Sequence, residues 1–226
     1  RGRDFTMPLF SLPGQGQSAS FNEFTGRVLV NWQPNPDHLI YGTISRGYKP
    51  GGITAVNQRF EAEIVTNFEA GWKGTLADGA VNGSASVFHM TYDGYQASVQ
   101  PDPNDPTSAL TENVDGTTVT GIEAQLSANV GGFSADVAFS YLDTSFGEQL
   151  TTLPAGADGN ATDLPFQFKG RRIPWAPEFS ISGGLAYEIP VGGGYLTPSL
   201  RVSHVAEQYS AFFLLPYHVV DERTLV

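Results

Sequence analysis

Apolar and polar residues alternate with a period of two along most of this chain. In residues 122–130, one parity is apolar throughout and the other is polar throughout. Because side chains point to opposite faces along a β-strand, this segment is predicted to be a strand with one apolar and one polar face. The same pattern predicts strands over 24–33, 67–76, 133–141, 179–189 and 196–202.

Two further segments alternate less regularly. In 38–48 the parity is mixed, and in 80–95 the alternation slips between Val87 and Phe88. Both are predicted to be strands because their neighbours need antiparallel pairing partners. The last six residues, 221–226, look like the start of one more strand.

The connections between the predicted strands are alternately short and long. The short ones are at 34–37, 78–79, 131–132 and 191–194, and the long ones at 47–62, 98–112, 145–176 and 206–218. In an antiparallel meander, alternate connections lie at opposite ends of the sheet. All tight turns are therefore expected at one end and all long loops at the other, which is typical of outer-membrane β-barrels.

Strand length and aromatic positions agree with a membrane-spanning sheet. Strands of about 10 to 14 residues, tilted by about 40°, span roughly 25 Å of apolar band. Aromatic residues gather near both predicted rims, as in two interfacial girdles, although aromatics also favour strand ends in sheets generally. They are Trp32, Trp72, Phe133, Tyr187 and Tyr195 near short turns, and Tyr48, Tyr92, Tyr95, Trp175 and Phe179 towards long loops.

Composition narrows the possible functions. The 226 residues carry 12 Lys and Arg against 23 Asp and Glu, a net charge of -11, so a nucleic-acid partner is not expected. There is no Cys, which excludes thiolate zinc sites and cysteine nucleophiles. No run approaches the roughly 18 apolar residues of a transmembrane helix. Strands with one lipid-facing side would explain why only 15% of the residues are charged.

No catalytic or metal-binding motif stands out. The four histidines lack ligand spacing, and no Gly-x-Ser-x-Gly nucleophile elbow is present. The acidic runs 102–106 and 158–163 do not match a calcium loop and are typical of turns. The sequence therefore predicts a protein that is not an enzyme and has no metal or other cofactor.

Several short motifs follow one another in a fixed order from about residue 24 to the end. The motifs are Phe24-Thr25-Gly26-Arg27-Val28, Trp32-Gln33-Pro34, Ser45-Arg46-Gly47-Tyr48-Lys49-Pro50-Gly51-Gly52, Asn67-Phe68-Glu69-Ala70-Gly71-Trp72-Lys73, Asn113-Val114-Asp115-Gly116 with Gly121-Ile122-Glu123, and Pro174 with Pro177. In this order they resemble the barrel of TonB-dependent outer-membrane receptors.

The resemblance implies a 22-stranded barrel in the cell outer membrane, closed by an N-terminal plug, which imports a large ligand such as an iron-siderophore using energy from TonB. Its partners would be the plug, TonB, the ligand, membrane lipid and lipopolysaccharide. The fold class expected for 1–226 is all-β, an antiparallel up-and-down meander forming an open partial barrel of about 8–9 strands. The plug domain and the final strands are expected to lie outside these residues.

Polar, charged and aromatic residues of such a barrel have expected roles. Polar residues of the inner face would meet water and the plug: Arg27, Asn31, Glu69, Lys73, Glu123, Gln125 and Asp136. Basic and aromatic residues in two long loops are the candidates for binding an anionic or aromatic ligand: Arg46, Tyr48, Lys49, Phe168, Lys169, Arg171, Arg172 and Trp175. Alternatively, the basic residues among them bridge lipopolysaccharide phosphates or pair with acidic loop residues.

Two other functions remain open at this point. The chain could be a complete small outer-membrane barrel with a structural or adhesive role, which requires a sheet closed on itself. It could also be a soluble, glycan-binding β-domain, which requires a second sheet over the apolar strand faces.

Overall fold

The computed structural model describes residues 20–54, 58–99, 110–153, 164–211 and 218–226. These residues form strands and one 3₁₀ turn, η1. The elements are β1 (Gly26–Asn35), β2 (His38–Lys49), β3 (Gly52–Ile53), β4 (Arg59–Phe60), β5 (Glu63–Leu76), η1 (Ala77–Gly79), β6 (Val81–Asp93), β7 (Tyr95–Val99), β8 (Leu110–Val114), β9 (Thr117–Val130), β10 (Phe133–Ser145), β11 (Leu150–Leu153), β12 (Leu164–Gln167), β13 (Phe179–Tyr187), β14 (Ile189–Val191), β15 (Gly194–Leu196), β16 (Ser199–Val205), β17 (Gln208–Tyr209), β18 (Val219–Val220) and β19 (Arg223–Leu225).

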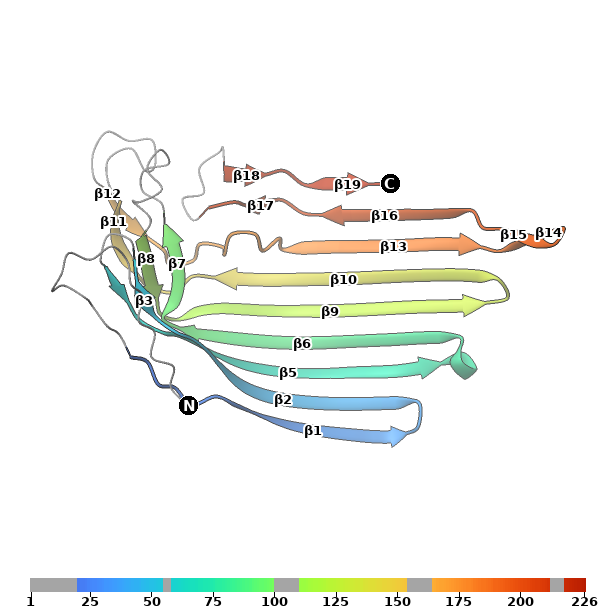
Figure 1. Ribbon diagram of the computed structural model, residues 1–226, viewed down its shortest axis with the longest axis horizontal. Coiled ribbons are helices and arrows are strands. Elements are labelled where there is room, and N and C mark those ends of the chain that lie inside the picture. Colours follow the sequence, from blue (N-terminus) through green and yellow to red (C-terminus); the bar gives the residue numbers. More distant parts are fainter. Residues whose placement is uncertain (1–19, 55–57, 100–109, 154–163, 212–217) are drawn as a thin grey trace, which may run out of the picture.

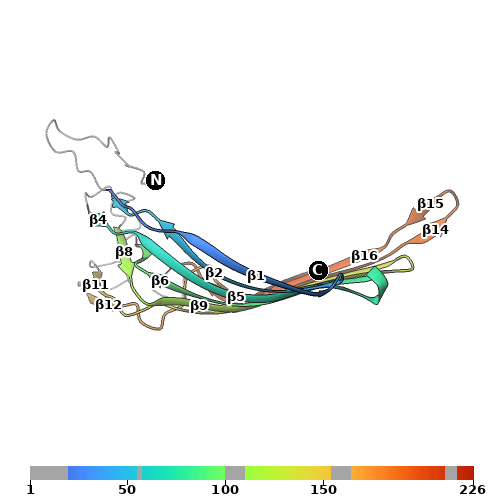
Figure 2. The same cartoon turned by 90° about the horizontal axis from the view of Figure 1, so that it is seen from below.

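Nine of these strands form one antiparallel meander, in the order β1-β2-β5-β6-β9-β10-β13-β16-β19 (Figure 1). Each predicted strand is present, including the irregular ones at 38–48 and 80–95 and the start of a ninth at the end of the chain. Among the described residues, β1 and β19 pair on one side only, so the sheet does not close. It is a curved, open wall (Figure 2).

Tight turns and long loops lie at opposite ends of the sheet, as predicted. The turns between β1 and β2, β5 and β6, β9 and β10, and β14 and β15 lie at one end, the turn end, on the right of Figure 1. The long connections lie at the other, the long-loop end. They contain two-stranded sheets that alternation did not predict: β3-β4, β7-β8, β11-β12 and β17-β18.

The four turns are staggered. One cross-strand row runs through His38, Gly74, Gly83, Leu126, Val137 and Gly183. Beyond this row, the first turn begins about one residue away and the fourth about nine residues away. A shift of about eight residues over about six strand spacings corresponds to a strand tilt of roughly 40°, within the range for barrels. The stagger explains why the β14-β15 hairpin extends farthest in Figure 1.

The two faces of the wall differ in chemistry. One face, here called the outward face, carries exposed apolar side chains in most rows, among them Ile122, Leu126, Val137, Ile181 and Leu185. Within the described residues no second sheet covers them, so the structure lacks the second layer that a soluble β-domain would need. The opposite, inward face carries the polar residues predicted for it, with Asn31, Tyr41, Gly71, Ser86 and Glu123 in one row.

The slip of parity between Val87 and Phe88 is not a slip of register. The pairing of β6 with both neighbours is continuous, so Val87 points outward and Phe88 inward. Gly121 leaves room for the Phe88 ring: a Cβ there would meet the Phe88 ring and also Leu142 Cδ2, at 2.9 Å. Phe88 is thus an apolar residue of the inward face.

The fully buried hydrophobic core of the described residues lies among the long loops. It consists of Ala97, Val114, Phe146 and Phe168, with Tyr95 and Ile173 packed against it. This set is called the loop core below. No helix in the described part of the chain has the length and hydrophobicity needed to cross a membrane.

Candidate functional site

The basic segment, residues 168–175, follows β12 and carries two exposed side chains of the predicted ligand site. Trp175 is 64% exposed and has a positive φ of 60°, and the Lys169 side chain is 63% exposed. Lys169 Nζ lies 3.5 Å from Glu148 Oε2, and Arg172 forms an ion pair with Glu178. These pairs are the acidic loop partners that the sequence left open as an alternative.

Arg171 is held more tightly than its neighbours. Its Nε donates a hydrogen bond to the backbone oxygen of Gln167 at 2.8 Å, and its own backbone oxygen accepts one from Phe146 N at 2.8 Å. Burial lowers the pKa of the Arg171 guanidinium, which nevertheless stays charged at any physiological pH. Arg171 therefore places a fixed positive charge within the segment that also carries Lys169 and Trp175.

Phe168 lies in the interior of the loops. It is fully buried and meets Phe146 edge to face, with 5.6 Å between ring centroids. Phe146 in turn meets Tyr95 at 5.3 Å, and Tyr95 meets Tyr92 at 5.4 Å. A side chain buried in this way supports the basic segment and offers a ligand no surface.

The other predicted loop residues, at the end of β2, lie on two different faces. Arg46 and Tyr48 have the parity of Ile44, an exposed residue of the outward face, and the pairing of β2 with β5 is regular throughout. Arg46 binds Glu23 Oε2 at 3.0 Å. Lys49 has the opposite parity and lies across the ladder from Glu63. The structure thus separates Arg46 and Tyr48 from the basic segment.

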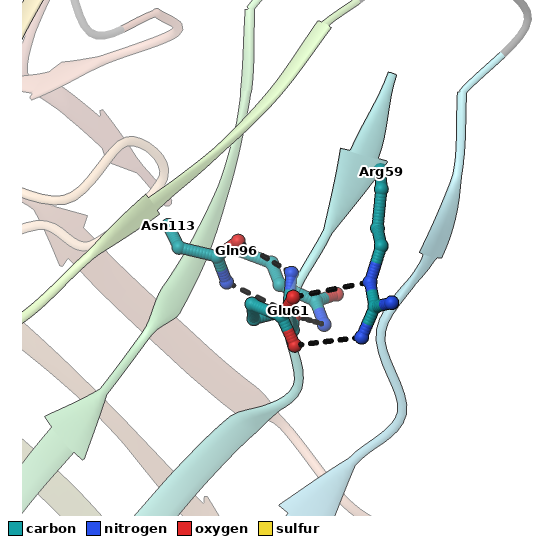
Figure 3. A network of polar contacts seen from close by, with 4 residues as sticks. All are labelled: Arg59, Glu61, Gln96 and Asn113. Carbon is teal, nitrogen blue, oxygen red and sulfur yellow. Dashed lines mark hydrogen bonds and ion pairs between the residues drawn. The ribbon is translucent and has the colours of Figure 1, made fainter. Parts of the chain in front are cut away.

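A polar network that residue types alone did not single out joins two of the loops (Figure 3). Asn113 at the end of β8 bonds to both backbone groups of Glu61, and Gln96 of β7 donates to the backbone oxygen of Glu61 at 3.1 Å. Arg59 Nε lies 3.1 Å from Glu61 Oε1. The available signal was the motif Asn113-Val114-Asp115-Gly116, which carried the resemblance but no role.

Tyr95 lies where the loop core meets the acidic end of β5. Burial raises the pKa of Tyr95 to about 12, and the nearby Glu63 carboxylate adds to the effect. The phenol is thus uncharged over the whole physiological pH range. Glu63 also accepts a hydrogen bond from Gln96 N at 2.8 Å, so the first peptide of β7 is bonded to the start of β5.

Several charged residues of the inward wall have a polar, aromatic or charged partner. Tyr41 donates to Glu69 Oε1 at 2.7 Å, and Lys73 Nζ lies 5.7 Å from the centre of the Tyr41 ring. Towards the turn end, Arg201 forms two hydrogen bonds with Asp136, at 3.0 and 3.2 Å. This pair spans the intervening strand β13 at Gly184, where a Cβ would lie 2.7 Å from Asp136 Oδ1.

A broad polar depression occupies the inward wall beside these pairs. Its volume is about 740 Å³, and Lys73, Asn82, Gln125, Asp136 and Arg201 are among its lining residues. In the described residues no group of three or more His, Cys, Asp or Glu is placed to hold a metal ion. The acidic runs 102–106 and 158–163 lie entirely outside the described residues.

Comparison with known proteins identifies the family. A sequence profile described as "TonB dependent receptor-like, beta-barrel" matches residues 3–221. The chain belongs to this family of TonB-dependent receptor barrels. Members of the family are transport receptors of the outer membrane, in agreement with the resemblance seen in the motifs.

Solved receptors share the fold. The ferric yersiniabactin uptake receptor FyuA of Yersinia pestis superimposes with a TM-score of 0.70 at 19% identity, over 92% of this chain and 29% of that one. The siderophore receptor PiuA of Acinetobacter baumannii gives 0.69 at 17% identity, over 95% and 30%. BauA, the ferric preacinetobactin receptor of the same species, gives 0.62 at 20% identity, over 96% and 30%. The chain thus spans about three tenths of the length of these receptors.

Proposed function

We propose that this TonB-dependent receptor barrel is one section of the wall of an outer-membrane receptor that imports a large ligand of the iron-siderophore class. The observation that carries the proposal is the open nine-stranded meander, apolar outside and polar inside, in a chain of this family. FyuA and the two structurally similar Acinetobacter proteins are all named for ferric or siderophore ligands.

The domain assignment belongs to the same proposal. Strands β1 and β19 each have one unpaired edge among the described residues, and unpaired backbone is not tolerated in hydrocarbon. Residues 1–226 are then a partial barrel, completed by further strands of the same receptor. The polar inward wall, with its depression beside Lys73 and Arg201, is the surface that the plug would cover. Energy from TonB would act on that plug.

Ligand capture is assigned to the basic segment, with Lys169, Arg171 and Trp175 as the contact residues. Lys169 and Trp175 are exposed and Arg171 adds a fixed charge, so an anionic or aromatic ligand suits them. Phe168 supports the segment from below. Arg172 and Lys49 face acidic partners. Arg46 and Tyr48, on the outward face at the rim, are assigned to lipopolysaccharide headgroups.

The test uses the full product of the gene in a host without ferric-siderophore receptors of its own. Uptake of radioactive iron is measured with a panel of ferric siderophores and divided by the amount of receptor at the cell surface. Import of one or more of them is expected. Failure to import any, with the protein present in the outer membrane, would refute the proposed function.

Variants then test the capture residues. Lys169→Ala and Trp175→Ala should each weaken ligand binding by about tenfold, the loss typical of an important interface side chain. Trp32→Ala is the matched control, because Trp32 is equally exposed (63%) but lies at the turn end. Equal binding by Trp175→Ala and Trp32→Ala would remove the basic segment from the site.

A further inference from the structure

The side chain of Asn113 takes the place of a peptide group between two loops. Its Oδ1 accepts a hydrogen bond from Glu61 N at 2.7 Å, and its Nδ2 donates to Glu61 O at 3.0 Å. Facing residues in an antiparallel ladder exchange the same two bonds. The carboxamide thus pairs with Glu61 as a neighbouring strand would, although Glu61 and Asn113 belong to different connections of the meander.

The same carboxamide also closes its own hairpin. The second hydrogen of Nδ2 is donated to Gly94 O at 2.9 Å, and Gly94 N donates to Asp115 Oδ1 at 2.7 Å. Gly94 has a φ of 66°, and a Cβ there would lie 2.7 Å from Ala62 O. Only glycine therefore lets the start of β7 lie against the segment that carries Glu61.

Gln96 adds a second connection between the same two loops. Its Nε2 donates to Pro50 O at 2.9 Å and to Glu61 O at 3.1 Å. The β7-β8 hairpin is therefore attached to the beginning and the end of the connection between β2 and β5. All these acceptors are backbone oxygens, which keep their place when surface side chains change.

The opposite side of the β7-β8 hairpin packs on the third loop. Ala97 and Val114 of the hairpin are buried against Phe146 and Phe168 in the loop core. Phe168 directly precedes Lys169 and lies within the basic segment. The hairpin thus has a polar attachment on one side and an apolar attachment on the other.

We propose that Asn113 is a positioning residue that joins the connection between β2 and β5 to the β7-β8 hairpin, so that these two loops and the basic segment move as one body. The inference rests on the proposed function only in its consequence, which is that ligand contact with the basic segment also restrains the loop that carries Arg59 and Glu61. The attachment itself is a property of the ligand-free protein.

Amide hydrogen exchange, measured by mass spectrometry on the full gene product without ligand, tests the attachment. Asn113→Asp keeps the size of the side chain but loses both donors and puts a carboxylate against Glu61 O and Gly94 O. Exchange in residues 59–63 and 94–97 should become faster by about tenfold or more, as expected when hydrogen bonds that close a local structure are lost. A change within about twofold would refute the role of Asn113.

Asn129→Asp is the matched control. Asn129 lies at the turn end of the next strand, β9, is exposed, and makes no side-chain hydrogen bond to any described residue. The same chemical change there should leave exchange in 59–63 unaltered. Both variants should retain the heat-dependent shift in gel mobility of a folded barrel. If Asn129→Asp accelerates 59–63 as much as Asn113→Asp, the effect is not specific and the proposal fails.

A double variant distinguishes a link between the two loops through Asn113 from a purely local effect of Asn113 on stability. Phe168→Ala loosens the hairpin from its apolar side, and in the wild-type background it should accelerate exchange in 59–63 through Asn113. In the Asn113→Asp background it should still accelerate 94–97 but add nothing in 59–63. An equal effect on 59–63 in both backgrounds would overturn the link. Because no ligand is used, this outcome is independent of whether the receptor imports siderophores.

Discussion

At the scale of single residues, Tyr95 makes the loop core sensitive to high pH. Its pKa is raised to about 12 in the folded protein, against 10 for an ordinary tyrosine, chiefly by burial. The folded state therefore holds the phenol proton more tightly than the unfolded state does. Its contribution to stability is fully present below pH 10 and is lost as the pH rises towards 12.

Opening of the loop core between pH 10 and 12 is the expected result, followed by the exchange rate of residues 94–97 and by tyrosinate absorbance. Tyr95→Phe should markedly weaken this pH dependence, because it removes the ionisable group of Tyr95 and keeps the ring. Tyr195→Phe, at an exposed position of the turn end, should leave it intact. Loss of the pH dependence in both variants, or in neither, would contradict the assignment to Tyr95.

Arg46 and Tyr48 show how far residue types can locate a site. Their chemistry and their place in a long-loop turn suggested ligand binding. Their side-chain direction depends on the register of β2 against β5, and 38–48 has mixed parity, so the sequence could not show which face they occupy. Phe168 is a similar case, because its burial depends on Phe146 and Val114, which are distant in sequence.

At the scale of elements, β9 has the clearest division between its two faces. Leu126 is on the exposed outward face, and its neighbour Gln125 lies on the inward face beside the polar depression. Lipid contacts one of these positions and water or protein the other. The two adjacent positions therefore test the orientation of the wall in the membrane.

Leu126→Arg is expected to destabilise the folded barrel by about 2 to 4 kcal/mol if it lies near the bilayer midplane, because the guanidinium must leave water. Gln125→Arg should change stability by less than about 1 kcal/mol, since the inward face is polar. Urea titration of the gene product refolded in lipid vesicles measures both. The reverse order of the two effects would mean that the faces have been assigned the wrong way round.

Alternation predicted six of the nine strands of the meander, because one face of each carries apolar residues at every second position. The strands at 38–48 and 80–95 were predicted only from the need of their neighbours for pairing partners. The hairpins within the loops could not be predicted in this way. Strands β7 and β8 are five residues each and are held by Asn113, Gln96 and the loop core. Their stability depends on partners from other loops, which a local pattern does not contain.

At the scale of the whole molecule, the two open edges determine how the 226 residues behave alone. The ladder ends at β1 and β19 among the described residues. A row of unpaired N–H and C=O groups on an apolar sheet promotes pairing with other chains.

The isolated chain, refolded in detergent, is therefore expected to associate into dimers or larger species, and light scattering coupled to size-exclusion chromatography measures this. The full gene product under the same conditions should not associate through these edges. A stable monomer of the isolated chain would show that β1 and β19 can close on each other, and would support the small-barrel alternative.

The stagger of the turns has a consequence for depth. One cross-strand row begins at Trp32, passes through Ile40, Trp72, Ala85, Ala124, Phe139 and Ile181, and ends at His204 and Thr224. With strands about 4.8 Å apart and tilted by about 40°, its eight steps descend or climb roughly 25 Å, the height of the apolar band. Residues that pair across the ladder therefore lie at different depths in the bilayer. A single row leads from an aromatic interface, through hydrocarbon, to the polar pair His204 and Thr224 at the opposite interface.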